Sequence, residues 1–163
     1  MGLDLPPGMG DFKLDVIIAT LTHSGEIKAQ TQKCIDKMIR RTHKEGLNLG
    51  IDRQTGALIP LSRNRAAEKA VDAESKFLLF VDSDMVFEDD ALLRLLKYDR
   101  DIISGLCCMR APPYTPVVKR RLLDGNYRVV EGLEKGRFYS DIDGVGAAFL
   151  LIKTKVLDRK SVV

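Results

Sequence analysis

The chain has 163 residues, of which 45% are hydrophobic and 30% are charged, a composition typical of one soluble globular domain with a substantial core. The net charge is only +3 and the basic residues are spread along the chain, so no nucleic-acid partner is indicated. No apolar run approaches the roughly 20 residues that span a bilayer, which predicts a protein without a membrane span.

The N-terminus and the cysteines indicate a cytoplasmic protein. Residues 1–14 are rich in proline and glycine and lack the basic start and apolar stretch of a secretory signal, so we interpret them as a flexible lead. Residues 15–163 then form the domain. Cys34 and the neighbouring pair Cys107 and Cys108 suit neither a disulfide framework nor a metal motif, and we expect reduced core thiols.

Strands and helices alternate through the first two thirds of the chain. Asp15–Thr20 is short, β-branched and apolar, which predicts a buried strand followed by a polar turn over residues 21–25. Apolar residues at helical spacing predict a helix from Ile27 to Lys44, with Ser24 as its N-cap. A second strand is predicted over Leu47–Asp52, and Ser62 is the candidate cap of the helix that follows it.

The third strand, Phe77–Val81, has no polar alternation and is therefore predicted to be buried on both faces. A helix is expected from Glu88, and a fourth strand over Asp101–Met109. Residues 122–130 predict a hairpin around the turn residues at 124–126, and the adjoining basic group is expected to be its solvated flank: Lys119, Arg120 and Arg121.

A last buried strand is predicted over Ile142–Lys153, with a helix starting after it. The alternation of strand and helix predicts an α/β fold, in which a mostly parallel sheet is covered on both faces. Ligands bind such sheets beyond the carboxyl ends of the strands. The edge that follows Val81 is therefore the expected functional edge.

Two carboxylates stand at that edge, in Asp82-Ser83-Asp84. Residues i and i+2 of an extended chain point to the same side, so we expect both side chains to converge. Two like charges in a partly dry site are unfavourable unless a cation or a shared proton offsets their repulsion, and Mg²⁺ or Mn²⁺ with a substrate diphosphate would do so. The alternative is a simple turn that caps the next helix.

Several segments in order resemble the GT-A fold glycosyltransferases that use nucleotide sugars, similar to the broad family 2 group. They are "DVIIAT" from Asp15, "SRNRAAEKAV" from Ser62, "FLLFVDSDM" from Phe77 and "DGVGAAFLLIKTKVL" from Asp143. The resemblance implies a three-layer sandwich with a mostly parallel central sheet and a small antiparallel portion. It also implies sugar transfer from a UDP- or GDP-sugar to an acceptor that the sequence does not identify.

The resemblance also implies roles for individual residues around the donor. Asp82 would lie near the ribose and metal, Asp84 would be the main ligand of Mn²⁺ or Mg²⁺, and Ser83 would lie beside the nucleotide. Thr20, Thr22 and Asp52 would line the nucleotide base, unless they only make strand-end hydrogen bonds. The phosphates would be bound by the group Arg63, Asn64 and Arg65, for which the alternative is a solvated helix face.

The downstream segment is expected to border the donor sugar and the acceptor cleft through Asp143, Gly144 and Gly146. The two glycines can instead mark a β-bulge or tight packing. In the family, the general base that deprotonates the acceptor follows this segment, so we expect it beyond Val163 in a longer enzyme. The alternative is that a partner chain or a local carboxylate supplies the base.

Two other functions are compatible with the same residues. "FVDSDMV" also fits the pattern of haloacid-dehalogenase-like phosphatases, in which the first aspartate, here Asp82, is the nucleophile and the second an acid/base. Two strand–helix units precede the motif here, whereas such phosphatases carry it on an early strand. A non-catalytic, nucleotide-binding fragment is the remaining alternative.

Overall fold

The computed structural model of the chain describes residues 13–56 and 58–158. Most of the expected flexible lead, residues 1–12, lies outside the described residues. Leu14, which we assigned to that lead, is buried in the core with 6% exposure. The folded part therefore includes at least this residue of the predicted lead.

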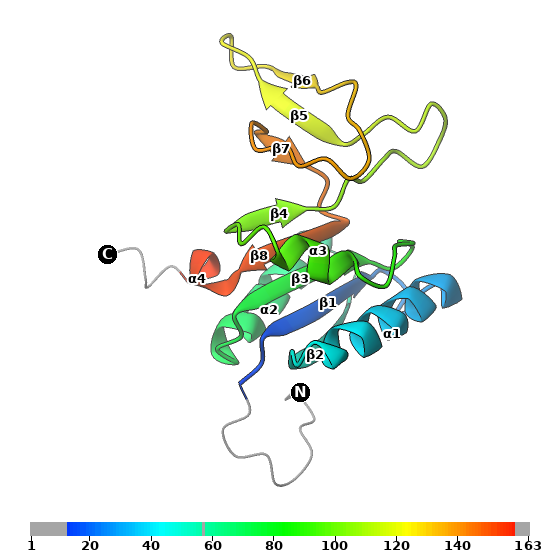
Figure 1. Cartoon of the computed structure of the whole chain (residues 1–163), viewed down its shortest axis with the longest axis vertical. Helices are drawn as coiled ribbons and strands as arrows, with labels where there is room; N and C mark the ends of the chain where they lie inside the picture. Colours follow the sequence, from blue (N-terminus) through cyan, green and yellow to red (C-terminus); the bar gives the residue numbers. More distant parts are fainter. Residues whose placement is uncertain (1–12, 57, 159–163) are drawn as a thin grey trace, which may run out of the picture.

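The main sheet has five strands in the order β2-β1-β3-β8-β4 (Figure 1). β1 is parallel to both β2 and β3, whereas β8 is antiparallel to both β3 and β4. The predicted mostly parallel sheet is thus confirmed. The strands are β1 (Val16–Thr22), β2 (Leu49–Thr55), β3 (Phe77–Asp82), β4 (Ile102–Ser104) and β8 (Phe149–Lys153).

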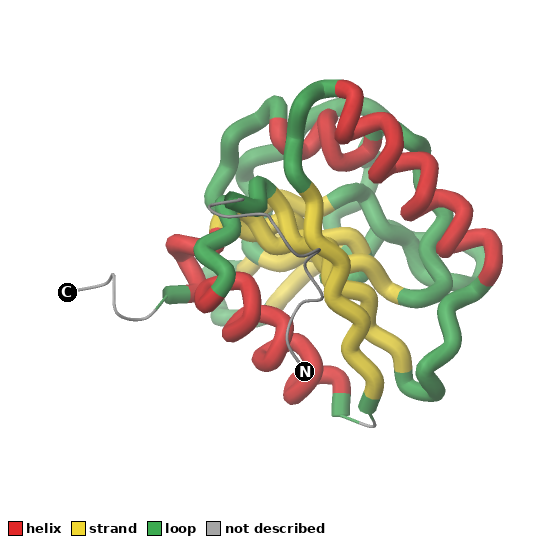
Figure 2. Tube along the Cα trace, turned by 90° about the horizontal axis from the view of Figure 1, so that it is seen from below, coloured by secondary structure: helices red, strands yellow, loops and turns green. Residues whose placement is uncertain are grey.

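Helices cover both faces of this sheet, as predicted (Figure 2). Side chains alternate between the two faces of a strand, so Ile18 of β1 packs with the α1 side and Ile17 with the α2 side. α3 shares the core of α1, and α4 contacts α2. The helices are α1 (Ala29–Lys44), α2 (Ile59–Asp72), α3 (Ala91–Leu96) and α4 (Thr154–Leu157).

Both predicted helix caps are wrong. β1 continues to Thr22, and α1 begins only at Ala29, with Lys28 in the cap position and no capping side chain. α2 begins at Ile59 with Pro60 in its first turn, where the missing N–H of proline has no helical partner to lose. Ser62 is therefore a buried residue inside the helix and not its cap.

A second, three-stranded sheet in the order β6-β5-β7 stands apart from the main sheet, above β4 in Figure 1. β5 (Val118–Arg121) and β6 (Tyr127–Val129) form the predicted hairpin, with Gly125 at φ +85° in its turn. β7 (Gly144–Val145) pairs with β5.

Two predicted strands are divided between the sheets. Of the fourth predicted strand only β4 forms, because the chain turns away after Ser104 and reaches the small sheet through a bridge between Cys108 and Pro116. The last predicted strand is interrupted at residues 146–148, since Gly144–Val145 pairs with β5 while Phe149–Lys153 enters the main sheet. In the part of the chain that the structure describes, no helix has the length and apolar character to cross a bilayer.

Candidate functional site

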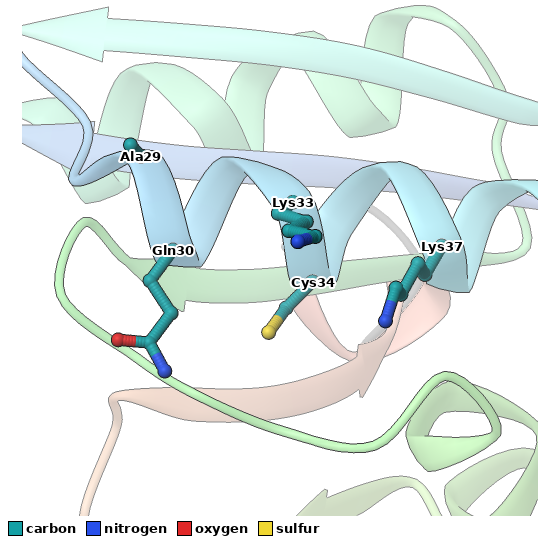
Figure 3. Close-up of a pocket in the computed structure, with 5 residues that line it drawn as sticks. All are labelled: Ala29, Gln30, Lys33, Cys34 and Lys37. Carbon is teal, nitrogen blue, oxygen red and sulfur yellow. The ribbon is translucent and has the colours of Figure 1, made fainter.

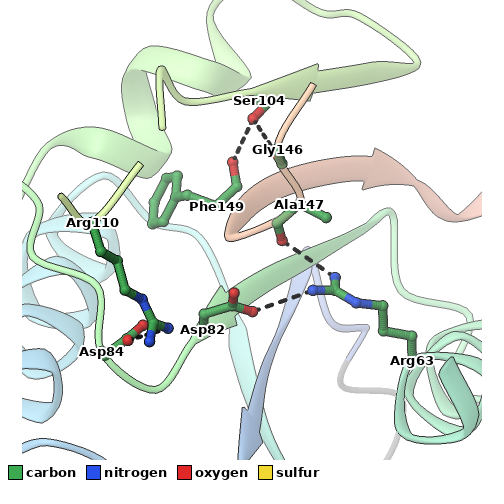
Figure 4. A network of polar contacts seen from close by, with 8 residues as sticks. All are labelled: Arg63, Asp82, Asp84, Ser104, Arg110, Gly146, Ala147 and Phe149. Atoms are coloured by element: carbon green, nitrogen blue, oxygen red, sulfur yellow. Dashed lines mark hydrogen bonds and ion pairs between the residues drawn. The ribbon is translucent and has the colours of Figure 1, made fainter. Parts of the chain in front are cut away.

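The site lies at the carboxyl edge of the parallel strands, where β3 ends at Asp82. Ser83 and Asp84 form a turn directly after the strand, in which the N–H of Met85 donates to the carbonyl of Asp82 at 3.3 Å. We call residues 82–84 the acidic turn. The chain is no longer extended at Asp84, yet the two carboxylates lie close enough to interact, because the charge of Asp84 contributes to the raised pKa of Asp82. Each carboxylate also faces its own arginine (Figure 4).

Asp82 is held from α2 and from the segment before β8. Arg63 donates from one guanidinium nitrogen to the Asp82 carboxylate and from another to the carbonyl of Ala147, each at 3.2 Å. The guanidinium also lies 4.8 Å from the ring centre of Phe80, which is two residues before Asp82 and on the same face of β3. Arg63 thereby links α2, β3 and the β7–β8 connection at the sheet edge.

The pKa of Asp82 is raised. Partial burial is the largest cause, and the neighbouring carboxylate of Asp84 adds to it, whereas Arg63 and Arg110 act in the opposite direction. The two arginines therefore do not fully offset the free-energy cost of ionising Asp82 in this partly buried position. Further positive charge at this edge would be favourable.

Asp84 forms an ion pair with Arg110. The Asp84 side chain is only 16% exposed, whereas that of Arg110 is 84% exposed, so the arginine can leave the carboxylate at little cost in packing. Both residues line a pocket of about 360 Å³, which we call the turn pocket. Its lining residues are Ser24, Glu26, Ile27, Lys28, Ser83, Asp84 and Arg110.

The turn pocket adjoins the start of α1. The N–H of Lys28 donates to the carbonyl of Ser83 at 3.0 Å, which fixes the helix start against the acidic turn. α1 has 16 residues, with no acidic side chain in its first turn and no capping side chain. Its positive end and Lys28 both favour an anion beside Asp84, whereas the carboxylate of Glu26, which lines the same pocket, opposes one.

The protein side chains at this site supply only part of the ligand shell of a divalent ion. Among residues 13–56 and 58–158, no group of three or more His, Cys, Asp or Glu side chains converges to hold a metal. Asp84 offers one carboxylate in a polar pocket, while Asp82 is engaged by Arg63. Mg²⁺ and Mn²⁺ commonly bind through one or two carboxylates with substrate phosphates completing the shell, which this donor set allows.

The predicted base-lining threonines lie on the other face of the sheet from Asp82. Thr20 and Thr22 are 1% and 6% exposed and share the face of Val16 and Ile18, against α1. The hydroxyl of Thr22 is buried and has no hydrogen-bond partner among the residues that the structure describes. Thr22 ends β1 at the same edge, one residue after Leu21, which pairs with Asp82.

Asp52 is buried in a structural network. Lys69 of α2 donates to one of its carboxylate oxygens at 2.6 Å, and Gln54 donates to the other at 2.7 Å. Both oxygens are therefore occupied, and the side chain is only 4% exposed. Sequence alone gave no means of recognising Lys69 as its partner, because the two residues are 17 positions apart.

Of the three candidate phosphate-binding residues, Arg63 alone is directed at the acidic turn. Asn64 and Arg65 are exposed on α2 and match the alternative of a solvated helix face. Helical geometry explains the division, since successive residues of a helix point about 100° apart.

The predicted downstream residues belong mainly to the small sheet. The exposed Asp143 accepts a hydrogen bond from the N–H of Arg121 at 2.7 Å, and Gly144 pairs with Lys119. A Cβ at Gly146 would lie 3.3 Å from the Cβ atoms of both Cys107 and Val117, so tight packing explains this glycine. Ala147 and Ala148, next in the chain, are the residues that reach the acidic turn.

Ser104 was missed by sequence reasoning. Its hydroxyl lies 2.9 Å from the carbonyl oxygen of Gly146 and 3.2 Å from that of Phe149, and so ties the end of β4 to the loop that presents Ala147 (Figure 4). It also lies 2.8 Å from the carbonyl of Gly105, and its single proton is shared among these acceptors. No local sequence signal identifies such a contact across 42 residues.

A larger hollow of about 510 Å³ runs along α1 and is lined by that helix alone (Figure 3). Its residues are Ala29, Gln30, Lys33, Cys34 and Lys37. It contains no carboxylate, and its lining residues come from one helix and not from the strand ends. We therefore assign the functional site to the smaller turn pocket.

Comparisons with known proteins identify the fold only. No model of a known protein family matches the chain. No curated protein matches it either. Among solved structures, the crystal structure of A197 from STIV is similar, with a TM-score of 0.57 and 17% identity over 90% of this chain and 68% of that one. At this identity, the similarity shows a shared α/β fold.

Proposed function

We propose that this protein is a metal-dependent glycosyltransferase that binds the diphosphate of a UDP- or GDP-sugar in the turn pocket. The observation that carries the proposal is the acidic turn at the carboxyl edge of a parallel sheet, beside a polar pocket with Lys28 and Arg110. A metal–diphosphate complex suits such a pocket, because its ion meets Asp84 while its phosphate oxygens meet the two cations.

The roles of the residues follow from their contacts. Asp84 would hold Mn²⁺ or Mg²⁺, which when bound neutralises the charge that develops on the nucleoside diphosphate as the sugar leaves. Arg110 would move from Asp84 to a phosphate oxygen. Arg63 would keep Asp82 and the carbonyl of Ala147 in place beside the donor. The proposal covers donor binding and leaving-group departure and assigns no acceptor or general base.

The cysteines suit the cytoplasmic location that we propose for this activity. Cys34, Cys107 and Cys108 are all free thiols, as expected in a reducing compartment, but the prediction that they are core residues is wrong for the exposed Cys108, and Cys34 is only half-buried. Burial raises the pKa of the Cys107 thiol, which makes it a core residue and not a nucleophile.

The test is the thermal stability of the protein with UDP-, GDP- and dTDP-sugars, each with and without Mn²⁺. A ligand that binds only the native state raises the unfolding temperature. We expect an increase with a UDP- or GDP-sugar that requires Mn²⁺, followed by release of the nucleoside diphosphate when a suitable acceptor is added. No increase with any nucleotide, with or without metal, would contradict the proposal.

The same preparation separates the two alternatives. Hydrolysis of a simple phosphomonoester without any nucleotide would identify a phosphatase that uses Asp82 as its nucleophile. Metal-dependent nucleotide binding without sugar release across a broad acceptor panel would identify a non-catalytic binding domain.

A further inference from the structure

The hairpin of β5 and β6 ends in an unusually exposed apolar tip. Leu123 is fully exposed and Leu122 is 43% exposed, directly after β5. Exposure of leucine side chains to water is unfavourable, and the leucines are not needed to form the turn, because residues 124–126 supply its hydrogen bonds. An exposed leucine pair at the end of a projecting element indicates a surface that meets an apolar partner.

The turn that presents this tip is well defined. Asp124 accepts hydrogen bonds from the backbone N–H and the side-chain amide of Asn126, at 2.9 Å and 3.0 Å. The N–H of Leu122 donates to the carbonyl of Asn126 at 2.7 Å and closes the hairpin. Backbone geometry therefore holds both leucines at the tip, where Leu122 is partly covered and Leu123 is fully exposed.

Cations and apolar groups alternate behind the tip. Across the two strands, Arg121 stands opposite Tyr127, and Lys119 stands opposite Val129. Residues opposite one another lie on the same face of a sheet, so these four side chains form one basic and apolar face. All four are exposed, Tyr127 by 56% and Val129 by 38%.

The charge of the hairpin is strongly one-sided. Residues 118–129 carry four cationic side chains and one carboxylate, that of Asp124. Arg120 is engaged by Asp141 at 2.8 Å, whereas Lys119, Arg121 and Arg128 form no ion pair with any residue that the structure describes. Three cations near the tip are thus free for an anionic partner.

We propose that this hairpin docks the protein on the surface of an anionic phospholipid bilayer. The leucines would enter the boundary between headgroups and acyl chains, Tyr127 would lie at the headgroup level, and Lys119 and Arg121 would contact the lipid phosphates. The tip points away from the main sheet, at the top of Figure 1, so that docking leaves the turn pocket uncovered. Single-stranded nucleic acid is less suited, because a leucine pair offers no stacking surface for bases.

The experiment is co-sedimentation of the protein with vesicles of phosphatidylcholine alone and of equal parts phosphatidylcholine and phosphatidylserine. We expect binding to the anionic vesicles about tenfold or more above binding to the neutral ones, since each basic residue near the surface adds to the attraction. Binding should weaken as salt is raised, because salt screens the charges. Equal binding to both vesicles, or no binding, would overturn the proposal.

Two double variants test the two parts of the surface separately. Leu122→Ser with Leu123→Ser removes the apolar tip, and Lys119→Gln with Arg121→Gln removes the facing cations. Each should lower binding to anionic vesicles by about tenfold or more, whereas Val156→Ser and Lys37→Gln, exposed residues on α4 and α1, should not.

Because the four replaced side chains are exposed, the unfolding temperature of both double variants should stay unchanged, which separates loss of binding from loss of fold. Unchanged vesicle binding by both double variants would overturn the proposal. So would retention on a single-stranded oligonucleotide, or concentration-dependent dimerisation, in place of vesicle binding. None of these results depends on the turn pocket.

Discussion

Arg63 and Arg110 bind the two carboxylates of the acidic turn in different ways. Arg63 is half-buried, contacts two elements besides its own and lies over an aromatic ring. Arg110 is almost fully exposed and forms its ion pair with Asp84. The first arginine is therefore expected to support the structure of the edge, and the second to exchange with a ligand.

Replacement of Arg63 by alanine should lower the free energy of unfolding by about 1–3 kcal/mol. The change leaves Asp82 without its cation and the carbonyl of Ala147 without its donor in a partly buried site. The matched control is Arg65→Ala on the exposed side of the same helix, for which we expect a change within about 0.5 kcal/mol. Urea unfolding measures both, and equal effects would contradict the assigned role of Arg63.

Replacement of Arg110 by alanine should strengthen binding of Mn²⁺ alone by up to about fivefold. An exposed ion pair is worth about 0.2–1 kcal/mol, and the metal no longer has to displace it from Asp84. Titration of Mn²⁺, followed by the paramagnetic resonance of the free ion, measures the affinity. Arg41→Ala, which removes an exposed pair with Glu45 at the far end of α1, should leave it unchanged. Weaker binding in Arg110→Ala would show that Asp84 is not the metal ligand.

The sequence identified the acidic turn but not the partners of its members. A run of apolar residues that ends in Asp82 is a local signal, and it correctly predicts the strand end. Ser104 and Ala147 act through backbone carbonyl contacts across long sequence separations, which leave no residue-type signature. The choice of Arg63 over its neighbours depends on the rotation of α2, which a misplaced helix start obscured.

At the level of elements, Asp15 connects the starts of the three parallel strands. Its carboxylate accepts from the N–H of Asn48 before β2, at 2.9 Å, and pairs with Lys76 before β3, at 2.8 Å. Burial opposes ionisation, but the hydrogen bond from Asn48 and the charge and hydrogen bond of Lys76 outweigh it and lower the pKa of Asp15. The folded state thus favours the ionised form.

This shift sets the sign of a pH dependence. A carboxylate with a lowered pKa stabilises the fold above its unfolded pKa of about 4 and loses that contribution as the pH falls through the folded value. Asp15→Asn should therefore cost about 1 kcal/mol of unfolding free energy at neutral pH and much less at an acidic pH below the folded pKa of the carboxyl group. Urea unfolding at both pH values measures the difference, with the exposed Asp72→Asn as control. A cost that is equal at both pH values would refute the role assigned to Asp15.

The central strands were predictable because burial on both faces gives them continuous apolar runs, and α1 was predictable because its apolar residues recur at helical spacing. β1, β3 and α1 lie within a few residues of their predicted positions, whereas the division of the last predicted strand into β7 and β8 was not foreseen. Residues 146–148 between the two pieces are small and continue the same sequence pattern, and the two pieces differ in their partners, since Gly144–Val145 pairs with β5 and Phe149–Lys153 enters the main sheet. Pairing partners are a tertiary property, which local patterns do not encode.

At the scale of the whole molecule, we propose different functions for the two sheets. The main sheet places the acidic turn and the turn pocket at its carboxyl edge, and the small sheet carries the basic hairpin away from it (Figure 1). The order of buried strands in sequence predicted the first arrangement. The exposed tip of the hairpin could not be recognised from sequence, because two leucines before a turn are equally typical of the end of a buried strand.

The most direct test is calorimetric titration of UDP and GDP into the protein with and without Mn²⁺, compared between wild type, Asp84→Asn and Asp72→Asn. Asp72 is an exposed carboxylate near the end of α2 and serves as the matched control. We predict that one nucleotide binds only with Mn²⁺ and that Asp84→Asn weakens it at least tenfold, about 1.4 kcal/mol, while Asp72→Asn does not. Nucleotide binding that is indifferent to both the metal and Asp84 would contradict the assignment of the turn pocket.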